Sequence, residues 1–217
     1  MRFRGGVLER STTLLSGAYS IYNHSMEVYK TLNDKIAAAV KAGRIAVIPT
    51  DTIYGIVGSA LRPETVERIY RLRKRSRTKP MIILIGELKQ LSLFGIKLDL
   101  ETKKKLDCFW PGKTSIILPC PSAKFRYLHR GKRTLAFRLP ALKSLSKFLQ
   151  KTGPLVAPSA NIEGMPPAQN IDEAKKYFGD KVDFYVDQGL RQGKPSALID
   201  LSGKTIKVLR LGPKKTS

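Results

Sequence analysis

Short apolar segments alternate with amphipathic segments from Leu32 onward, and this alternation constrains the fold more than any other feature of the chain. Helices and strands therefore interleave, which is typical of an α/β fold. We predict a single twisted, mixed β-sheet with flanking helices. Strands are predicted at 44–49, 81–85, 115–119, 134–140, 155–158, 183–187, 197–201 and 205–211. Helices are predicted at 34–42, 64–74, 87–95, 100–110, 141–151 and 171–179.

Residues that begin or end helices agree with this pattern at four places. Asn33 and Asn170 are predicted N-caps, because their side-chain oxygens can accept hydrogen bonds from the free N–H groups of a first turn. Pro63 suits the first position of a helix. Gly43 can adopt the left-handed conformation that ends one.

The same pattern indicates how the chain is organised. Residues 26–212 are expected to form one domain, preceded by a poorly ordered N-terminal extension at 1–25 and followed by a tail at 213–217. The aliphatic runs are far shorter than the roughly 20 residues that cross a bilayer, so we expect no membrane span. Cys108 and Cys120 form no zinc or CxxC pattern, which favours a reducing, intracellular location. We expect the cytoplasm, with an organelle as the alternative if residues 1–25 are a transit peptide.

The charge of the chain points to an anionic partner. Lys and Arg number 40 against 17 Asp and Glu, giving a formal net charge of +23. Such a field attracts polyanions, although basic charge can also serve only solubility. Composition alone does not separate a nucleotide from a nucleic acid.

The sequence lacks the motifs of several common nucleotide-binding, metal-binding and hydrolase sites. The segments 112–114 and 203–205 both read Gly-Lys-Thr, but neither has the earlier glycine that a phosphate-binding P-loop needs. No GxGxxG, HExxH, EF-hand or GxSxG pattern is present. His24 and His129 are too few and too far apart to indicate a metal site.

Three polar clusters lie beside predicted strands. Residues 68–79 hold seven basic side chains and no acidic one, directly before the strand 81–85. The loop 50–55 follows a strand with two hydroxyls and a glycine, and 159–161 follows another with Ser, Ala and Asn. Ligands of α/β sheets bind where strands end, so these clusters indicate a polar cleft for a charged small molecule. Taken singly, a charge run can be a solvated helix end and Ser-Ala-Asn a plain turn.

Several ordered motifs resemble those of one family, the YrdC-like threonylcarbamoyl-AMP synthases, across about 26–212. The resemblance implies a YrdC-like fold and a nucleotidyltransferase that makes threonylcarbamoyl-adenylate. The implied substrates are L-threonine, bicarbonate or carbon dioxide, and ATP, with pyrophosphate released and the product used to modify tRNA. The motifs are PTDTIYG (49–55), RKRSRTKP (73–80), WPGKTS (110–115), AFRLP (136–140), APSANIEG (157–164), and KPSALIDL (194–201) followed by VLRLG (208–212).

The resemblance also implies roles for individual residues. The implied catalytic residues are Arg73, Arg75, Ser159 and Asn161. The implied ATP-binding residues are Arg75, Lys79, Ser115, Ser159, Asn161 and Arg210. The implied threonine-binding residues are Thr52, Arg138 and Ser196. Mg²⁺ is expected with ATP and without protein ligands.

The chain departs from the family pattern at several positions. Arg73 stands where the family usually has Lys, and Ser76 and Lys113 where it has Pro. Ser115 and Ala197 stand where it has Thr, and the histidine that some members carry after the strand 81–85 is missing. The length matches the short, single-domain form of the family.

Two other functions stay open at this stage. One is a non-catalytic YrdC-like protein that binds tRNA or double-stranded RNA, which the net charge would favour. The other is a carbamoyl-transfer domain, although the zinc-type cysteines and the acylphosphatase-like segment that accompany that module are missing here. The expected partner of a synthase is the downstream threonylcarbamoyl-transfer machinery, with no membrane involved.

Overall fold

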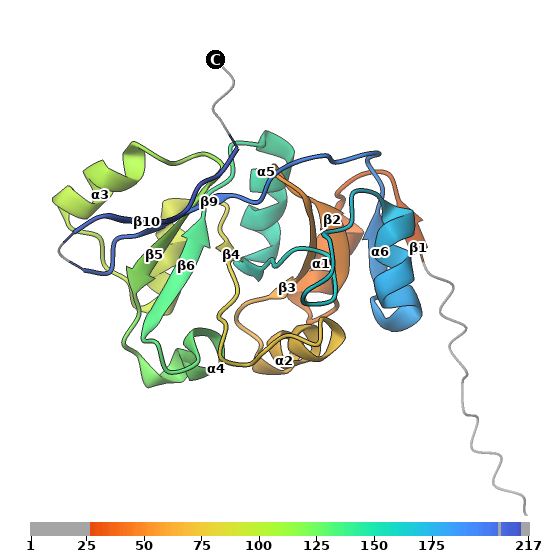
Figure 1. The fold of residues 1–217 in the computed structure, drawn as a ribbon, viewed down its shortest axis with the longest axis horizontal. Coiled ribbons are helices and arrows are strands. Elements are labelled where there is room, and N and C mark those ends of the chain that lie inside the picture. Colours follow the sequence, from red (N-terminus) through yellow and green to blue (C-terminus); the bar gives the residue numbers. More distant parts are fainter. Residues whose placement is uncertain (1–26, 204, 214–217) are drawn as a thin grey trace, which may run out of the picture.

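The computed structural model describes residues 27–203 and 205–213, in which ten strands form one β-sheet (Figure 1). The strands lie in the order β1-β8-β2-β3-β7-β4-β6-β5-β9-β10. Their bounds are β1 (Glu27–Tyr29), β2 (Ala46–Pro49), β3 (Tyr54–Ser59), β4 (Ile83–Leu84), β5 (Thr114–Pro119), β6 (Thr134–Arg138), β7 (Leu155–Val156), β8 (Phe184–Val186), β9 (Ala197–Asp200) and β10 (Lys207–Arg210).

The sheet is mixed, which confirms the predicted fold class. Parallel neighbours are β1/β8, β2/β8, β4/β6 and β5/β9. Antiparallel neighbours are β2/β3, β3/β7, β4/β7, β5/β6 and β9/β10. The helices are α1 (Asp34–Lys41), α2 (Pro63–Leu72), α3 (Leu100–Asp107), α4 (Arg126–His129), α5 (Lys143–Thr152) and α6 (Ile171–Phe178), with 3₁₀ turns η1 (Leu88–Phe94), η2 (Ala123–Phe125) and η3 (Gly179–Lys181).

Helices pack on both faces of the sheet, because successive strand residues point to opposite sides. In β2, Val47 joins the core that includes α2, α4 and α6, whereas Ile48 joins the core that includes α1 and α5. Ile83 and Leu84 of β4 divide in the same way. The two-sided burial explains why these strands are apolar runs rather than alternating segments.

The predicted helix signals are confirmed. The side-chain oxygens of Asn33 and Asn170 accept from the backbone N–H groups of Ile36 and Glu173. Pro63 opens α2, and Gly43 follows α1 with φ of +108°. Local sequence therefore sets where these helices begin and end.

Two strands, the short helix α4 and the type of one other helix were not predicted correctly. The loop expected at 50–55 ends early, because β3 begins at Tyr54 and pairs with both β2 and β7. Its two glycines conceal the strand in sequence, and pairing on both sides overrides that weak local preference. β1 was also missed, since it has only three residues and forms through its parallel partner β8. The helix expected at 87–95 is the 3₁₀ turn η1.

The expected extension at 1–25 lies outside the described residues, as do residues 214–217 of the expected tail. Within the described ranges, no helix is long and apolar enough to cross a bilayer.

Replacement of Gly86 by alanine should destabilise the fold, because a Cβ there would lie 2.7 Å from the backbone nitrogen of Gln150 in α5. We expect Gly86→Ala to lower the free energy of unfolding by about 1–3 kcal/mol, the usual cost of overpacking. Gly203→Ala is the matched control, since its Cβ would meet nothing within 4 Å. Urea unfolding measures both, and equal stability of the two variants would contradict the packing described here.

Candidate active site

A cavity of about 400 Å³ lies over one face of the sheet and the loops at the neighbouring strand ends. Its apolar part is formed by Ile117 of β5, Ala136 of β6, Leu198 of β9 and Leu209 of β10. Its polar part comes from the turn after β2, the loop before β4, the end of β6 and the segment after β7. The predicted clusters at 50–55, 68–79 and 159–161 therefore each contribute to one cavity.

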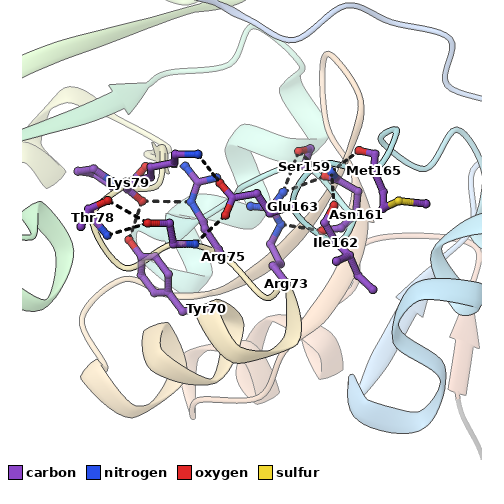
Figure 2. A network of polar contacts seen from close by, with 12 residues as sticks. Tyr70, Arg73, Arg75, Thr78, Lys79, Ser159, Asn161, Ile162, Glu163 and Met165 are labelled. Carbon is purple, nitrogen blue, oxygen red and sulfur yellow. Dashed lines mark hydrogen bonds and ion pairs between the residues drawn. The ribbon is translucent and has the colours of Figure 1, made fainter.

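Arg73 links the basic cluster to the segment after β7. It follows the last residue of α2, and Lys74 then turns the chain with a φ of +48°. The Arg73 side chain donates from Nε to the carbonyl of Asn161 (3.0 Å) and from Nη2 to Asn161 Oδ1 (2.9 Å) and Ser159 Oγ (3.2 Å) (Figure 2). These contacts hold the two segments together at the edge of the cavity.

The Arg73 guanidinium is nearly fully buried, with 2% of the residue exposed. Its Nη1 has no hydrogen-bond partner among the described residues, and its three bonded acceptors are all uncharged. Burial, with a smaller contribution from Arg75, lowers the pKa of Arg73 to about 10, so the group remains charged at neutral pH. A buried cation with a spare donor suits an anionic ligand, because burial of an uncompensated charge is costly.

Asn161 and Ser159 are fixed by the same network. Ser159 Oγ donates to Asn161 Oδ1 (2.6 Å), and Asn161 Nδ2 donates to the carbonyls of Ile162 and Met165. The backbone of Ala160 donates to Tyr54 in β3, which holds this segment beside the sheet. Asn161 therefore orients Arg73 and Ser159, while its own polar atoms are occupied.

Arg75 and Lys79 lie on the basic loop, which we define as residues 73–79. Arg75 donates to the carbonyls of Lys79 (3.1 Å) and Pro80 (3.0 Å), and this folds the loop back on itself. Lys79 Nζ donates to Glu163 Oε1 (2.9 Å), and Arg75 Nη1 lies 3.9 Å from the same oxygen. Glu163, in the segment after β7, is thus the shared carboxylate partner of Arg75 and Lys79, whereas Arg77 pairs with Glu67 of α2 (3.6 Å).

Hydroxyls and a buried ion pair form a further part of the cavity wall. Thr50 Oγ1 lies 3.1 Å from Thr52 Oγ1 and donates to the carbonyl of Ile53, which shapes the turn after β2. Arg138 Nη2 lies 3.0 Å from Asp51 Oδ1, and both side chains are 5% exposed. Burial raises the pKa of Asp51, and Arg138 opposes that rise. Arg138 Nε has no hydrogen-bond partner among the described residues.

The segment that leads into β9 closes against this wall. Tyr54 Oη donates to the carbonyl of Gly189 (2.8 Å), and a Cβ on Gly193 would lie 2.1 Å from the carbonyl oxygen of Thr52. Only glycine allows such close backbone approach. This contact brings Ser196 to the cavity.

Ser196 is the centre of the last polar group. Its carbonyl accepts from Arg210 Nε (2.9 Å), and its Oγ lies 2.9 Å from Ser115 Oγ. Burial lowers the pKa of Arg210. Ser115 is fully buried behind Ser196.

The structure brings most of the predicted site residues to the cavity. Two predicted site residues, Ser115 and Asn161, do not line the cavity but contact residues that do. Their implied roles toward substrates stay predictions. The predicted residues that line the cavity are Thr52, Arg73, Arg75, Lys79, Arg138, Ser159, Ser196 and Arg210.

Sequence reasoning missed Lys132 and Thr134, which also line the cavity. Thr134, Ala136 and Arg138 alternate along β6 and share the cavity face, whereas Leu135 and Phe137 enter the core. Strand alternation counted back from Arg138 would have found Thr134. Glu163 was part of a quoted motif but received no role.

No carboxylate occurs among the described residues that line the cavity. In the part of the chain that the structure describes, no group of three His, Cys, Asp or Glu side chains is arranged to hold a metal ion. The site as built therefore favours anions.

The fold and the site define an α/β protein with a cation-lined cavity beside the strand ends. The sequence profile of the Sua5/YciO/YrdC family, described as Telomere recombination, matches residues 38–212. The chain belongs to this family, and its fold is the predicted YrdC-like fold.

Individual relatives agree with this assignment. A Mycobacterium tuberculosis protein is 33% identical over 180 residues, covering 82% of each chain. A Pyrococcus abyssi protein named threonylcarbamoyl-AMP synthase is 32% identical over 181 residues, which are 82% of this chain and 53% of that protein. The chain thus spans about half the length of that relative.

Solved structures show the same likeness. Sua5 of P. abyssi, complexed with L-threonine, matches with a TM-score of 0.76 and 30% identity over 82% of this chain and 53% of that chain. YciO of E. coli matches with a TM-score of 0.75 and 22% identity over 86% of this chain and 96% of that chain, a likeness of fold alone.

The polar network around Arg73 should contribute to stability. Asn161→Ala removes the Oδ1 that accepts from Arg73 and Ser159, so we expect the free energy of unfolding to fall by about 1–3 kcal/mol. Ser159→Ala should cost less, because Asn161 still accepts from Arg73. Urea unfolding of both variants tests this order. An Asn161→Ala variant as stable as the unmodified protein would mean that the network does not hold the segments together.

Proposed function

We propose that the chain is a threonylcarbamoyl-AMP synthase, which joins L-threonine, bicarbonate or carbon dioxide, and ATP and releases pyrophosphate. The main support is a cavity whose described lining has six cationic side chains and no carboxylate. The chain is also 32% identical to a protein named threonylcarbamoyl-AMP synthase. The six cations are Arg73, Arg75, Lys79, Lys132, Arg138 and Arg210.

The reaction joins two anions, and the cations make this possible. The threonine amine adds to carbon dioxide and loses a proton, which gives a carbamate. A carbamate oxygen then attacks the α-phosphorus of ATP, the bond to the β-phosphate oxygen breaks, and pyrophosphate leaves. Arg73 and Arg75 would offset the charge that repels the attack and builds up in the transition state. Ser159 and Asn161 orient Arg73 for this role.

Two groups of lining residues suit the two larger substrates. The polyphosphate would lie along Arg73, Arg75 and Lys79, with the base over the apolar residues of β5, β6, β9 and β10. Threonine would lie by Thr52, Arg138 and Ser196, where hydroxyls and a guanidinium can bind its polar groups. The L-threonine complex of P. abyssi Sua5 supports the choice of amino acid.

Mg²⁺ would enter as part of the substrate MgATP. The described lining offers no carboxylate ligand, so the phosphates and water would complete the coordination. The ion would offset phosphate charge, and the residues of this chain would bind and orient the complex.

The proposed product would serve tRNA modification in the cytoplasm, by passing to threonylcarbamoyl-transfer machinery. Direct contact with RNA is a second candidate activity, favoured by a basic hollow of about 440 Å³ beside the basic loop. Arg77, Arg126 and Arg130 line it. Such a surface would bind a phosphate backbone with strong salt dependence.

Pyrophosphate release from ATP should require both threonine and bicarbonate, because the carbamate is the attacking group. The expected products are the adenylate and pyrophosphate, followed with labelled bicarbonate on thin-layer plates and with a pyrophosphate assay. Equal pyrophosphate release without threonine would exclude a synthase. ADP as the main product would exclude it too, since it reports attack at another phosphorus.

Arg75→Ala should lower kcat/KM for ATP by at least about tenfold, the effect of about 1.4 kcal/mol of lost transition-state stabilisation. Arg71→Ala is the control, because Arg71 is exposed on α2 and does not line the cavity. It should change kcat/KM by less than about threefold. If both variants show the same small loss, and salt removes it, the basic run acts only as a diffuse attractor of polyanions such as RNA.

A further inference from the structure

Glu163 holds the basic loop through both its backbone and its side chain. Its N–H donates to the carbonyl of Arg73 (2.8 Å), and its Oε2 accepts from the N–H of Ser76 (2.7 Å). Its Oε1 accepts from Lys79 Nζ and lies near Arg75 Nη1 (Figure 2). The carboxylate thus fills an anion site made by a backbone N–H and two cations.

Two cationic groups of that anion site also line the cavity. Lys79 and Arg75 belong to the wall proposed to bind the polyphosphate, whereas Glu163 lies behind them and outside the lining. Among the described residues, Glu163 and Asp51 are the carboxylates within 4.0 Å of a cationic group that lines the cavity.

These two carboxylates differ in how readily they can exchange partners. Asp51 and Arg138 are both 5% exposed, so separation would leave two buried charges uncompensated. The Lys79 side chain is 60% exposed and that of Glu163 is 24% exposed. A partly solvated ion pair is weak, and the flexible lysine can leave it for another anion at little cost.

We propose that Glu163 is an affinity-determining residue, which binds Lys79 and Arg75 in the ligand-free protein and competes with the phosphates of the nucleotide for them. The proposal rests on the proposed function, since it takes the polyphosphate as the ligand. Lys79 exchanges Glu163 for a phosphate oxygen when ATP binds, and returns to it when pyrophosphate leaves. Glu163 weakens the binding of both and so favours product release.

The substitution Glu163→Gln tests whether the negative charge of Glu163 competes with the phosphates. Glu163→Gln keeps an oxygen that can accept from Ser76 and keeps the backbone bond to Arg73, but removes the negative charge. The hydrogen bonds from Lys79 and from the N–H of Ser76, with a smaller contribution from the charge of Arg75, lower the pKa of the Glu163 carboxyl, so its negative charge is present at neutral pH in the unmodified protein. The substitution therefore isolates electrostatic competition from the shape of the loop.

Calorimetric titration with inorganic pyrophosphate and with MgATP measures the effect. We expect Glu163→Gln to lower the Kd of both by about threefold to tenfold at low salt, and the gain to shrink as salt rises. Glu64→Gln is the matched control, because it removes the same charge from the exposed first turn of α2. It should leave both Kd values within about twofold. Thermal unfolding checks that each variant is folded.

A double-mutant cycle with Lys79→Ala identifies the shared partner. The gain from Glu163→Gln should fall by at least half when Lys79 is absent. If the folded Glu163→Gln variant binds pyrophosphate as well as or more weakly than the unmodified protein, the inference is overturned, and Glu163 only stabilises the basic loop. If Glu163→Gln binds pyrophosphate more tightly as expected but the unmodified protein makes no adenylate, the inference is supported and the proposed function is overturned. If the unmodified protein binds neither pyrophosphate nor MgATP, both the inference and the proposed function are overturned.

Discussion

The buried Arg73 guanidinium is the interaction on which the rest of the site depends. Its bonds to Ser159 and Asn161 join the end of α2 to the segment after β7. The basic loop starts at this point, so the positions of Arg75 and Lys79 follow from it. A guanidinium suits this role because its fixed fork can bind two groups and still present a further donor. The resemblance implied Lys at this position. An ammonium has three N–H donors and a guanidinium has five, so Arg73 makes its three bonds and keeps donors to spare.

The site balances an excess of cations with two carboxylates of different kinds. Asp51 is buried and neutralises Arg138 as a fixed part of the wall. Glu163 is partly solvated and neutralises the basic loop from behind. The first pair gives the wall a stable shape, because neither charge can be left alone in the interior. The second leaves Lys79 able to change partner, so the cavity combines a fixed ion pair with an exchangeable one.

Local patterns identified the α/β class, most strands and three polar clusters of the cavity. Arg138, Ser196 and Arg210 were named only through the resemblance to the family. Caps at Asn33 and Asn170 and apolar runs such as 81–85 act within a few residues. Sequence reasoning missed β3, whose glycines hide a strand that forms only through neighbours on both sides. It also missed Glu163, since its role exists only where the segment after β7 meets the basic loop. The resemblance implied that Ser115 binds ATP, but Ser115 is fully buried and contacts Ser196, which lines the cavity.

We expect Nη1 of Arg73, which has no hydrogen-bond partner in the described part of the chain, to bind the polyphosphate. A crystal structure with a non-hydrolysable ATP analogue and threonine measures this directly. We expect a phosphate oxygen about 2.7–2.9 Å from Arg73 Nη1, the length of a charge-assisted hydrogen bond, with Lys79 Nζ moved from Glu163 to a phosphate. Phosphates bound instead in the hollow of Arg77, Arg126 and Arg130, with Arg73 Nη1 contacting no ligand, would contradict the account.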